Sequence, residues 1–227
     1  FRFFATWVYL VAVISNEESL VAFLPTLRAA PWIAIDTEAD SLHAYPEKLC
    51  LLQISIPGHD RLVDPLAGFS IAPLFPIFHE HELIMHGSDY DLRLFKRGFD
   101  FVPTRIFDTM IAARLLGYRE FSLTVLVANK LGVTLEKGPQ KMDWARRPLT
   151  ARMEAYARND THYLHPLAEQ LRSELVARGR LAWQEQSCAQ LIKEASQARK
   201  PDPETVWRIK GSDRLSPRAL AILREIF

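Results

Sequence analysis

Two carboxylates in the first quarter of the chain have the residue types and the spacing for shared chemistry. Asp36 and Glu38 lie two residues apart, directly after the apolar run 32–35. That run is typical of a β-strand, along which side chains alternate, so both carboxylates project from one face. Two acids side by side repel each other unless a cation or a proton lies between them. Taken alone, the same pair is also typical of a solvated strand end.

Other acids that could act together with Asp36 and Glu38 are distant in the sequence, so only the folded chain can bring them close. Tyr156 and Asp160 are four residues apart in a helical pattern, which places them one turn apart on one face. Asp91 follows the strand-like run 83–85 at the start of a helix, where the helix dipole favours an acid in any case. Asp89 is an alternative to Asp91 at this place. Separately, each of these residues is compatible with an ordinary core, capping or solvated side chain.

Considered together, the four acids form a set of hard oxygen ligands that come from separate elements. Such ligands suit Mg²⁺ or Mn²⁺, and a chain whose only cysteines are Cys50 and Cys188 offers no thiolate zinc site. Two ions about 3.5–4 Å apart stabilise both the attacking and the leaving oxygen when a phosphodiester is cleaved. The pattern therefore predicts two divalent ions and phosphodiester chemistry.

Three blocks of the sequence carry a resemblance to a known family. They are Ile35-Asp36-Thr37-Glu38, His86-Gly87-Ser88-Asp89-Tyr90-Asp91 and Tyr156-Ala157-Arg158-Asn159-Asp160. In order and spacing they resemble the exonuclease motifs of the ribonuclease D family, in the subclass of DEDD 3′-5′ exonucleases whose third motif has Tyr four residues before Asp. Residues 143–149, Asp-Trp-Ala-Arg-Arg-Pro-Leu, resemble a stretch typical of ribonuclease D and of exosome-associated exoribonucleases. The resemblance covers roughly residues 30–175.

The resemblance implies a metal-dependent 3′-5′ exoribonuclease that releases nucleoside 5′-monophosphates with two Mg²⁺ or Mn²⁺ ions. Asp36 would bridge both ions, Glu38 and Asp160 would complete the first, and Asp91, five residues after His86, would hold the second. Tyr156 would orient the attacking water. Because a phenol with a pKa near 10 is a poor general base at neutral pH, metal coordination would do most of the water activation. The implied partner is RNA with a single-stranded 3′ end, tRNA precursors and other structured RNAs included.

Two other functions stay open on the same fold. One is a 3′-5′ DNA exonuclease of the Werner or proofreading type. The Arg-Pro-Leu block favours an RNA substrate over this alternative. The other is a non-catalytic RNA-binding protein. The presence of all five motif residues favours an enzyme over this alternative. Comparing RNA with DNA, and cleavage with binding, separates the three.

Substrate contacts are predicted beside the first motif and in a basic loop. Leu42 and His43 follow the Asp-x-Glu motif, where Ala39 replaces an aromatic residue found in many bacterial ribonuclease D chains. The loop 137–147 combines cations with Trp144, and cations suit the backbone of a single strand. We expect the cations to contact substrate and Trp144 to pack inward. The predicted substrate-binding residues are Leu42, His43, His86, Lys137, Lys141 and Arg147.

The elements that must position these residues follow from hydrophobic patterns. Strands are expected at 7–14, 32–35, 49–56, 61–63, 83–85 and 104–107. The second to fourth are closely spaced and predict an antiparallel meander, whereas a helical pattern before the last predicts a parallel crossover. Ser15 and Glu18 form a capping-box pattern that predicts a helix start. From 109 onward the pattern is helical, so we expect an α/β, ribonuclease H-like mixed sheet of five to six strands flanked by helices.

Length and composition place these elements in an ordinary globular chain. With 227 residues, 48% hydrophobic residues and a net charge of +1, no global charge indicates nucleic acid or membrane. The longest apolar stretch, 3–14, is too short to span a membrane, so we expect a cytoplasmic monomer without membrane contact. Two prolines at 201–203 indicate a linker, and the following residues resemble the opening of a helical HRDC domain. We assign 1–200 to the exonuclease domain and 201–227 to the linker and a partial HRDC-like segment.

The remaining acids and histidines receive plainer interpretations. Asp40 is expected to be solvated and Asp108 to cap a helix. The pair His79/His81 has no acid or thiol partner at ligand spacing beyond Glu80 and Glu82. We do not expect a transition-metal site at this pair or at His162/His165.

Overall fold

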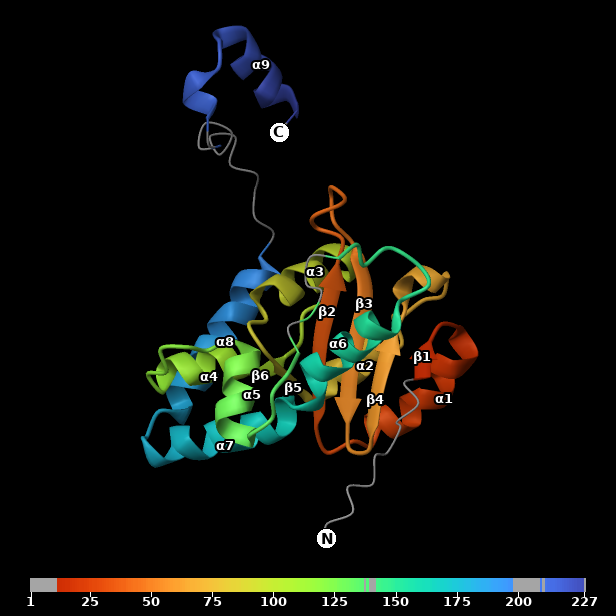
Figure 1. Cartoon of the computed structure of the whole chain (residues 1–227), viewed down its shortest axis with the longest axis vertical. Helices are drawn as coiled ribbons and strands as arrows, with labels where there is room; N and C mark the ends of the chain where they lie inside the picture. The colour runs from red at the N-terminus through yellow and green to blue at the C-terminus, as the bar shows by residue number, and fades with distance from the viewer. Residues whose placement is uncertain (1–11, 137, 139–141, 198–208, 210, 227) are drawn as a thin grey trace. The chain divides into compact units, whose positions relative to one another are not determined.

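A mixed six-stranded sheet organises the larger part of the computed structural model, which describes residues 12–136, 138, 142–197, 209 and 211–226 (Figure 1). The order of the strands across the sheet is β1-β4-β3-β2-β5-β6. Their bounds are β1 Ala12–Ile14, β2 Ile33–Ala39, β3 Leu49–Ile56, β4 His59–Val63, β5 Glu82–Met85 and β6 Arg105–Asp108. The number and kind of strands agree with the mixed sheet that the sequence predicts.

The pairing of the strands confirms the predicted meander and crossover. β2, β3 and β4 are antiparallel neighbours, and β5 and β6 add to β2 in parallel. β1 pairs in parallel with β4; residues 7–11 of the predicted first strand lie outside the described residues. In the β2–β3 pair Asp36 lies opposite Gln53, and the register shifts only between Glu38 and Ala39.

Helices cover both faces of the sheet, which is why all eight residues of β3 are buried. One face packs against α1 (Glu17–Arg28), α2 (Leu74–Glu80), α3 (Asp89–Phe99) and α8 (Leu181–Ser196). The other packs against α4 (Thr109–Leu115), α5 (Leu123–Leu131), α6 (Ala151–His162) and α7 (Leu164–Ala177). Among these, α6 lies across β2, β3 and β4 (Figure 1).

The N-cap residues of α1 and α4 test two predictions made from local sequence patterns. The predicted capping box at Ser15 and Glu18 is wrong, because α1 is capped by Asn16, whose side-chain oxygen accepts the Ser19 N–H at 2.8 Å. Asn is as favourable an N-cap residue as Ser. From position 16, one residue after Ser15, its side chain reaches the N–H of Ser19, the third residue of the helix. The prediction for Asp108 is confirmed: it caps α4 by accepting the N–H groups of Met110 and Ile111.

The chain divides into two units, Phe1–Ser196 and Gln197–Phe227. The second unit holds a short 3₁₀ turn, Ser212–Arg214, and α9 (Pro217–Ile226). α9 begins at Pro217 after Ser216, whose hydroxyl accepts the Ala219 N–H. The predicted linker falls on residues outside the described ones, and the HRDC-like assignment of 201–227 stays a prediction. Within the described residues, no helix has the length and apolar character needed to span a membrane.

Candidate active site

A cleft of about 740 Å³ lies where β2 and β5 end and α3 and α6 meet the sheet. The carboxyl ends of parallel strands are the usual place for a site in an open α/β sheet. All five residues predicted to do chemistry line this cleft, namely Asp36, Glu38, Asp91, Tyr156 and Asp160. The structure thus brings together side chains from three separate elements, and their individual roles stay predictions.

Each acid is placed by its own element. Asp36 and Glu38 alternate with Thr37 on β2, so both face the side of the sheet that α6 covers. Asp91 stands in the first turn of α3, directly after β5. Tyr156 and Asp160 lie one turn apart on α6, and a hydrogen bond joins the phenol to the Asp160 carboxyl.

Burial and mutual repulsion disfavour the charged forms of these acids. Burial, followed by the charges of Asp91, Asp160 and Glu38, raises the pKa of Asp36 well above its ordinary value. Burial and the charges of Asp160 and Asp91 raise the pKa of Glu38 to about 9. Burial is also the main reason why the pKa of Asp91 and that of Asp160 rise to about 7. Bound protons or cations are therefore needed to reduce the repulsion among the four carboxylates.

The donor set fits hard divalent cations. Four carboxylates from β2, α3 and α6 meet in one cleft, and oxygen ligands of this kind are those that Mg²⁺ and Mn²⁺ prefer. In the part of the chain that the structure describes, no three Asp, Glu, His or Cys side chains already have the arrangement of a metal site. The fit thus rests on the chemistry of the four side chains and on their shared cleft.

Asp91, and not Asp89, belongs to the cleft. The Thr37 hydroxyl donates a hydrogen bond to the Asp91 carboxylate, which is 6% exposed. Asp89 points to the surface and pairs with Arg93 at 2.5 Å. Sequence reasoning missed Thr37, although a hydroxyl residue between two acids of a strand faces the opposite side and can meet the next helix.

The turn that carries the second motif is held by Asp108. This fully buried carboxylate accepts the Gly87 N–H at 3.1 Å and both the N–H and the hydroxyl of Ser88 at 2.8 Å. Gly87 has φ +68°, a conformation that glycine adopts without strain. In the same turn His86 lines the cleft, its Nδ1 lies 2.9 Å from the Thr109 hydroxyl, and burial lowers its pKa.

Leu42 and His43, two of the other predicted substrate residues, are not among the residues that line the cleft. Leu42 and His43 are exposed in the turn after β2, and Leu42 has 67% of its surface accessible. Lys137 and Lys141 lie outside the described residues. Substrate contact by these residues stays a prediction.

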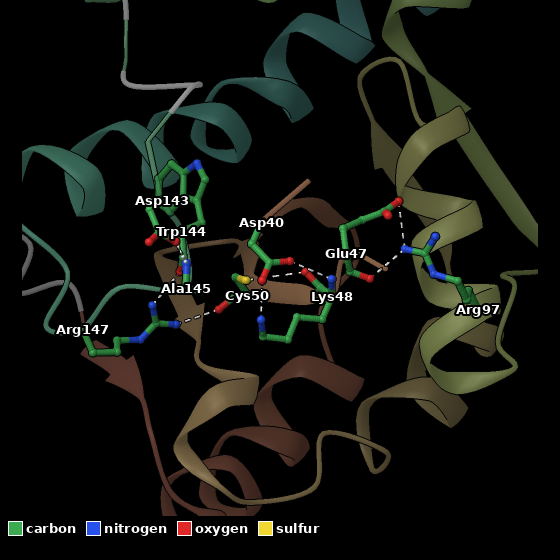
Figure 2. A network of polar contacts seen from close by, with 9 residues as sticks. All are labelled: Asp40, Glu47, Lys48, Cys50, Arg97, Asp143, Trp144, Ala145 and Arg147. Carbon is green, nitrogen blue, oxygen red and sulfur yellow. Dashed lines mark hydrogen bonds and ion pairs between the residues drawn. The ribbon is translucent and has the colours of Figure 1, made fainter. Parts of the chain in front are cut away.

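Arg147 has its guanidinium directed toward protein groups, among them the carbonyl of Cys50 (Figure 2), and its substrate role stays a prediction. Its Nε and Nη2 hold the two carboxylate oxygens of Asp64, each at 2.7 Å, and Nη2 also donates to the Cys50 carbonyl at 2.7 Å. Its Nη1 donates to the carbonyls of Trp144 and Arg146. These contacts use all five guanidinium N–H groups.

Trp144 packs inward, as predicted, and is 1% exposed. Its indole lies 6.2 Å from the Tyr156 ring, centroid to centroid. The backbone at Gly138 lies directly against the ring of Tyr156. A Cβ atom at this position would overlap that ring. The loop thus shapes the surroundings of the cleft tyrosine.

The expectation that Asp40 is solvated is wrong. Asp40 is 1% exposed, and its carboxylate accepts the Lys48 backbone N–H at 2.8 Å together with the Lys48 ammonium (Figure 2). Glu47 is bound through its carbonyl and its carboxylate to Arg97 of α3, both at 2.9 Å. The two ends of the segment 40–48 are therefore joined by the contacts between Asp40 and Lys48. The contacts of Glu47 with Arg97 bind the same segment to α3, the helix that carries Asp91.

Three of the four histidines in the two histidine pairs have protein partners. His81 lies 2.8 Å from the Ile77 carbonyl through Nδ1 and 3.2 Å from the Ala30 carbonyl through Nε2. His162 pairs with Asp60 at 2.7 Å, and His165 stacks on Trp32 with ring centroids 4.2 Å apart.

Comparison with known proteins adds an independent finding. Residues 11–176 match the family of 3′-5′ exonucleases. Ribonuclease D of Jannaschia sp. (strain CCS1) is 33% identical over 221 residues, which cover 94% of this chain and 57% of that protein. The chain thus spans little more than half the length of the curated relatives it matches first.

Solved structures agree with this match. The crystal structure of Escherichia coli RNase D, an exoribonuclease involved in structured RNA processing, aligns with a TM-score of 0.79 and 31% identity over 94% of this chain and 58% of that one. The catalytic core of RRP6 from Trypanosoma brucei aligns with a TM-score of 0.80 and 28% identity over 96% and 63%. These likenesses confirm the predicted α/β exonuclease fold.

Two more distant structures hold ligands. Brucella melitensis NrnC with bound Mg²⁺ has a TM-score of 0.64 and 25% identity over 82% of this chain and 89% of its own. The same protein bound to pGG has a TM-score of 0.67 and 28% identity over 74% and 84%.

Proposed function

The chain belongs to the 3′-5′ exonuclease family and is related to ribonuclease D, and on this basis we propose that it is a metal-dependent exoribonuclease. It would release nucleoside 5′-monophosphates from RNA 3′ ends, with tRNA precursors and other structured RNAs as substrates. The observation that carries the proposal is the meeting of four carboxylates and Tyr156 in one cleft. A second finding that supports it is the exoribonuclease activity stated for the Escherichia coli relative.

The acids would hold two divalent ions, Mg²⁺ or Mn²⁺. Asp36 would contribute to both, Glu38 and Asp160 to the first and Asp91 to the second. When bound, such ions supply charge neutralisation, activation of water and stabilisation of the leaving oxygen. The Mg²⁺ held by Brucella melitensis NrnC supports this choice of cation.

The protein's own residues orient the reactants. Tyr156, bonded to Asp160, would orient the attacking water through its hydroxyl. Thr37 fixes the Asp91 carboxylate, and Asp108 fixes the turn before it. Leu123, Val125 and Leu135 line the cleft with apolar surface, which suits a nucleoside base near the acidic centre.

A single assay tests the proposed reaction. A 5′-labelled single-stranded RNA is incubated with the full chain and Mg²⁺, Mn²⁺ or a chelator, and we expect a ladder that shortens from the 3′ end only with metal. Asp36→Asn should slow cleavage by roughly a thousandfold or more, because it removes a charge from both proposed ion sites. Its melting temperature without metal should not fall, since one of the repelling charges is gone.

Asp89→Asn is the matched control, because Asp89 is in the same turn but faces the surface. It should keep the wild-type rate. RNA left intact by the wild-type chain under every condition, or an Asp36→Asn variant with full turnover, contradicts the proposal. A matched DNA oligonucleotide degraded faster than the RNA would favour the DNA exonuclease instead.

A further inference from the structure

Gln53 carries a side-chain amide that is buried in the sheet. It lies in the middle of β3 and is 0% exposed. Among the described residues, neither its Nε2 nor its Oε1 has a hydrogen-bond partner. A buried polar group that stays unpaired is unfavourable and rare in folded proteins, so this one asks for a physical reason.

The register of the sheet places this amide beside the first motif. Gln53 lies directly opposite Asp36 in the antiparallel β2–β3 pair. Side chains of directly opposite residues share one face of the sheet, with Cβ atoms about 4.5–5.5 Å apart. On its other side Gln53 faces Leu62 of β4, which belongs to an apolar cluster with Leu51 and Ala157. Asp36 is therefore the polar side chain that the register sets beside Gln53.

The next buried polar residue on the same strand and face shows the contrast. Ser55 is 1% exposed, and its hydroxyl lies 2.6 Å from the Asp60 carboxylate and 2.7 Å from the Thr161 hydroxyl. Ser55 lies opposite Ala34, away from the acids. The fold thus satisfies this buried polar group from within and leaves unsatisfied the one that lies beside Asp36.

We propose that Gln53 is a positioning residue for Asp36 in the metal-loaded site. Its amide N–H would donate to the Asp36 carboxylate and fix the orientation in which that group meets the cations. A neutral amide suits this task, because it donates a hydrogen bond without adding a charge that competes with the ions or repels the acids. This inference rests on the proposed function and deepens it.

The test compares metal binding with stability in the full chain. Gln53→Leu removes both polar atoms, so the melting temperature without metal should stay the same or rise. The Mn²⁺ concentration that gives half of the metal-induced rise in melting temperature should increase about tenfold or more, as is typical when a residue that orients a metal ligand is lost. The Mn²⁺ needed for half-maximal RNA cleavage should increase by the same factor. Gln53→Met, which keeps the unbranched shape, repeats the test if the leucine variant does not fold.

Ser55→Ala is the matched control. It should lower the melting temperature without metal, because Asp60 and Thr161 lose a partner, and should leave the half-saturating Mn²⁺ unchanged. A Gln53→Leu variant with a lower melting temperature and wild-type Mn²⁺ dependence would assign Gln53 to stability alone and overturn the inference. A wild-type chain with no Mn²⁺-induced change in melting temperature overturns it too. If the wild-type chain responds to Mn²⁺ but cleaves no RNA, only the proposed function fails, and the melting data on Gln53→Leu still decide the inference.

Discussion

At the scale of single residues, the stability of the protein depends on what neutralises the four carboxylates that line the cleft. Burial raises the pKa of Asp36, Glu38, Asp91 and Asp160 above the values that these groups have in an unfolded chain. In the folded state they keep protons that the unfolded state has already lost. The stability gained in this way is complete below the unfolded pKa values near 4 and is lost as the pH rises through the folded ones.

We therefore expect the metal-free protein to become less stable as the pH rises from about 4 to about 9. This window follows from pKa values of about 7 for Asp91 and Asp160 and about 9 for Glu38. Each proton that only the folded state retains contributes a slope of about 1.4 kcal/mol per pH unit. Mn²⁺ should bind more tightly as the pH rises, because its ligands must be ionised. Thermal unfolding at several pH values, with and without Mn²⁺, measures both effects.

The variant Asp36→Asn again serves as a control here. With one acid replaced by a neutral group, repulsion on the other three decreases, and the loss of stability with pH should become shallower. A metal-free melting temperature that stays constant or rises over the same pH range would show that the carboxylates are neutralised by some other means.

At the scale of elements, the loop before α6 and the sheet are joined by one ion pair. Arg147 binds both carboxylate oxygens of Asp64, and Asp64 in turn accepts the Leu66 N–H. The same guanidinium holds the carbonyl of Trp144, whose ring packs near Tyr156. The pair thus acts on the cleft indirectly, through the segment that surrounds its tyrosine.

Two neighbouring arginines should consequently behave differently. Arg147→Ala leaves a nearly buried carboxylate without its cation, which should lower the free energy of unfolding by about 3 kcal/mol. Arg146 is exposed, so Arg146→Ala should leave stability unchanged and raise KM for RNA a few-fold, if the loop contacts the substrate backbone. Urea unfolding and steady-state kinetics of both variants measure this. An Arg147→Ala variant that is as stable as the wild type but binds RNA poorly would support the substrate role predicted from the sequence.

The elements themselves could be predicted because their signals are local. The runs 49–56 and 61–63 are rich in apolar residues, close in sequence and separated by residues 57–60, which begin with the turn Pro57-Gly58, and this is enough to predict the β3–β4 hairpin. The spacing of Tyr156 and Asp160 is likewise a property of one helix. Elements that each carry one motif were thus recognised, together with the acids on them.

What the sequence does not show are partners that meet only in the fold. The partner of Arg147 is Asp64, 83 residues away, and no local pattern joins them. Asp40 was expected to be solvated because acids near strand ends usually are, but Lys48 folds back onto it. Gln53 becomes notable only when the register sets it opposite Asp36. In each case a contact that no local pattern shows decides the surroundings of a polar side chain.

At the scale of the whole molecule, charge is divided unevenly between the two units. Gln197–Phe227 contains seven Lys or Arg and four Asp or Glu residues. The remaining 21 basic and 23 acidic residues give the larger unit a formal charge of −2. A polyanion such as RNA is attracted by local cations, so the smaller unit is the part whose charge favours RNA.

We expect a chain that ends at Ser196 to retain the chemistry and lose affinity. The acids, the sheet and α6 all belong to the larger unit, so the melting temperature and kcat on a short RNA should stay close to those of the full chain. KM for a longer RNA should rise, and its dependence on salt should weaken, because each phosphate contact that is lost reduces the logarithmic salt slope by about 0.7 for a single strand. The full chain with Arg214, Arg218 and Arg224 changed to Gln is the control, since it keeps the length and removes charge only. If both proteins keep the wild-type KM and salt slope, RNA is held by the larger unit alone, and the basic loop before α6 becomes the place to look for its contacts.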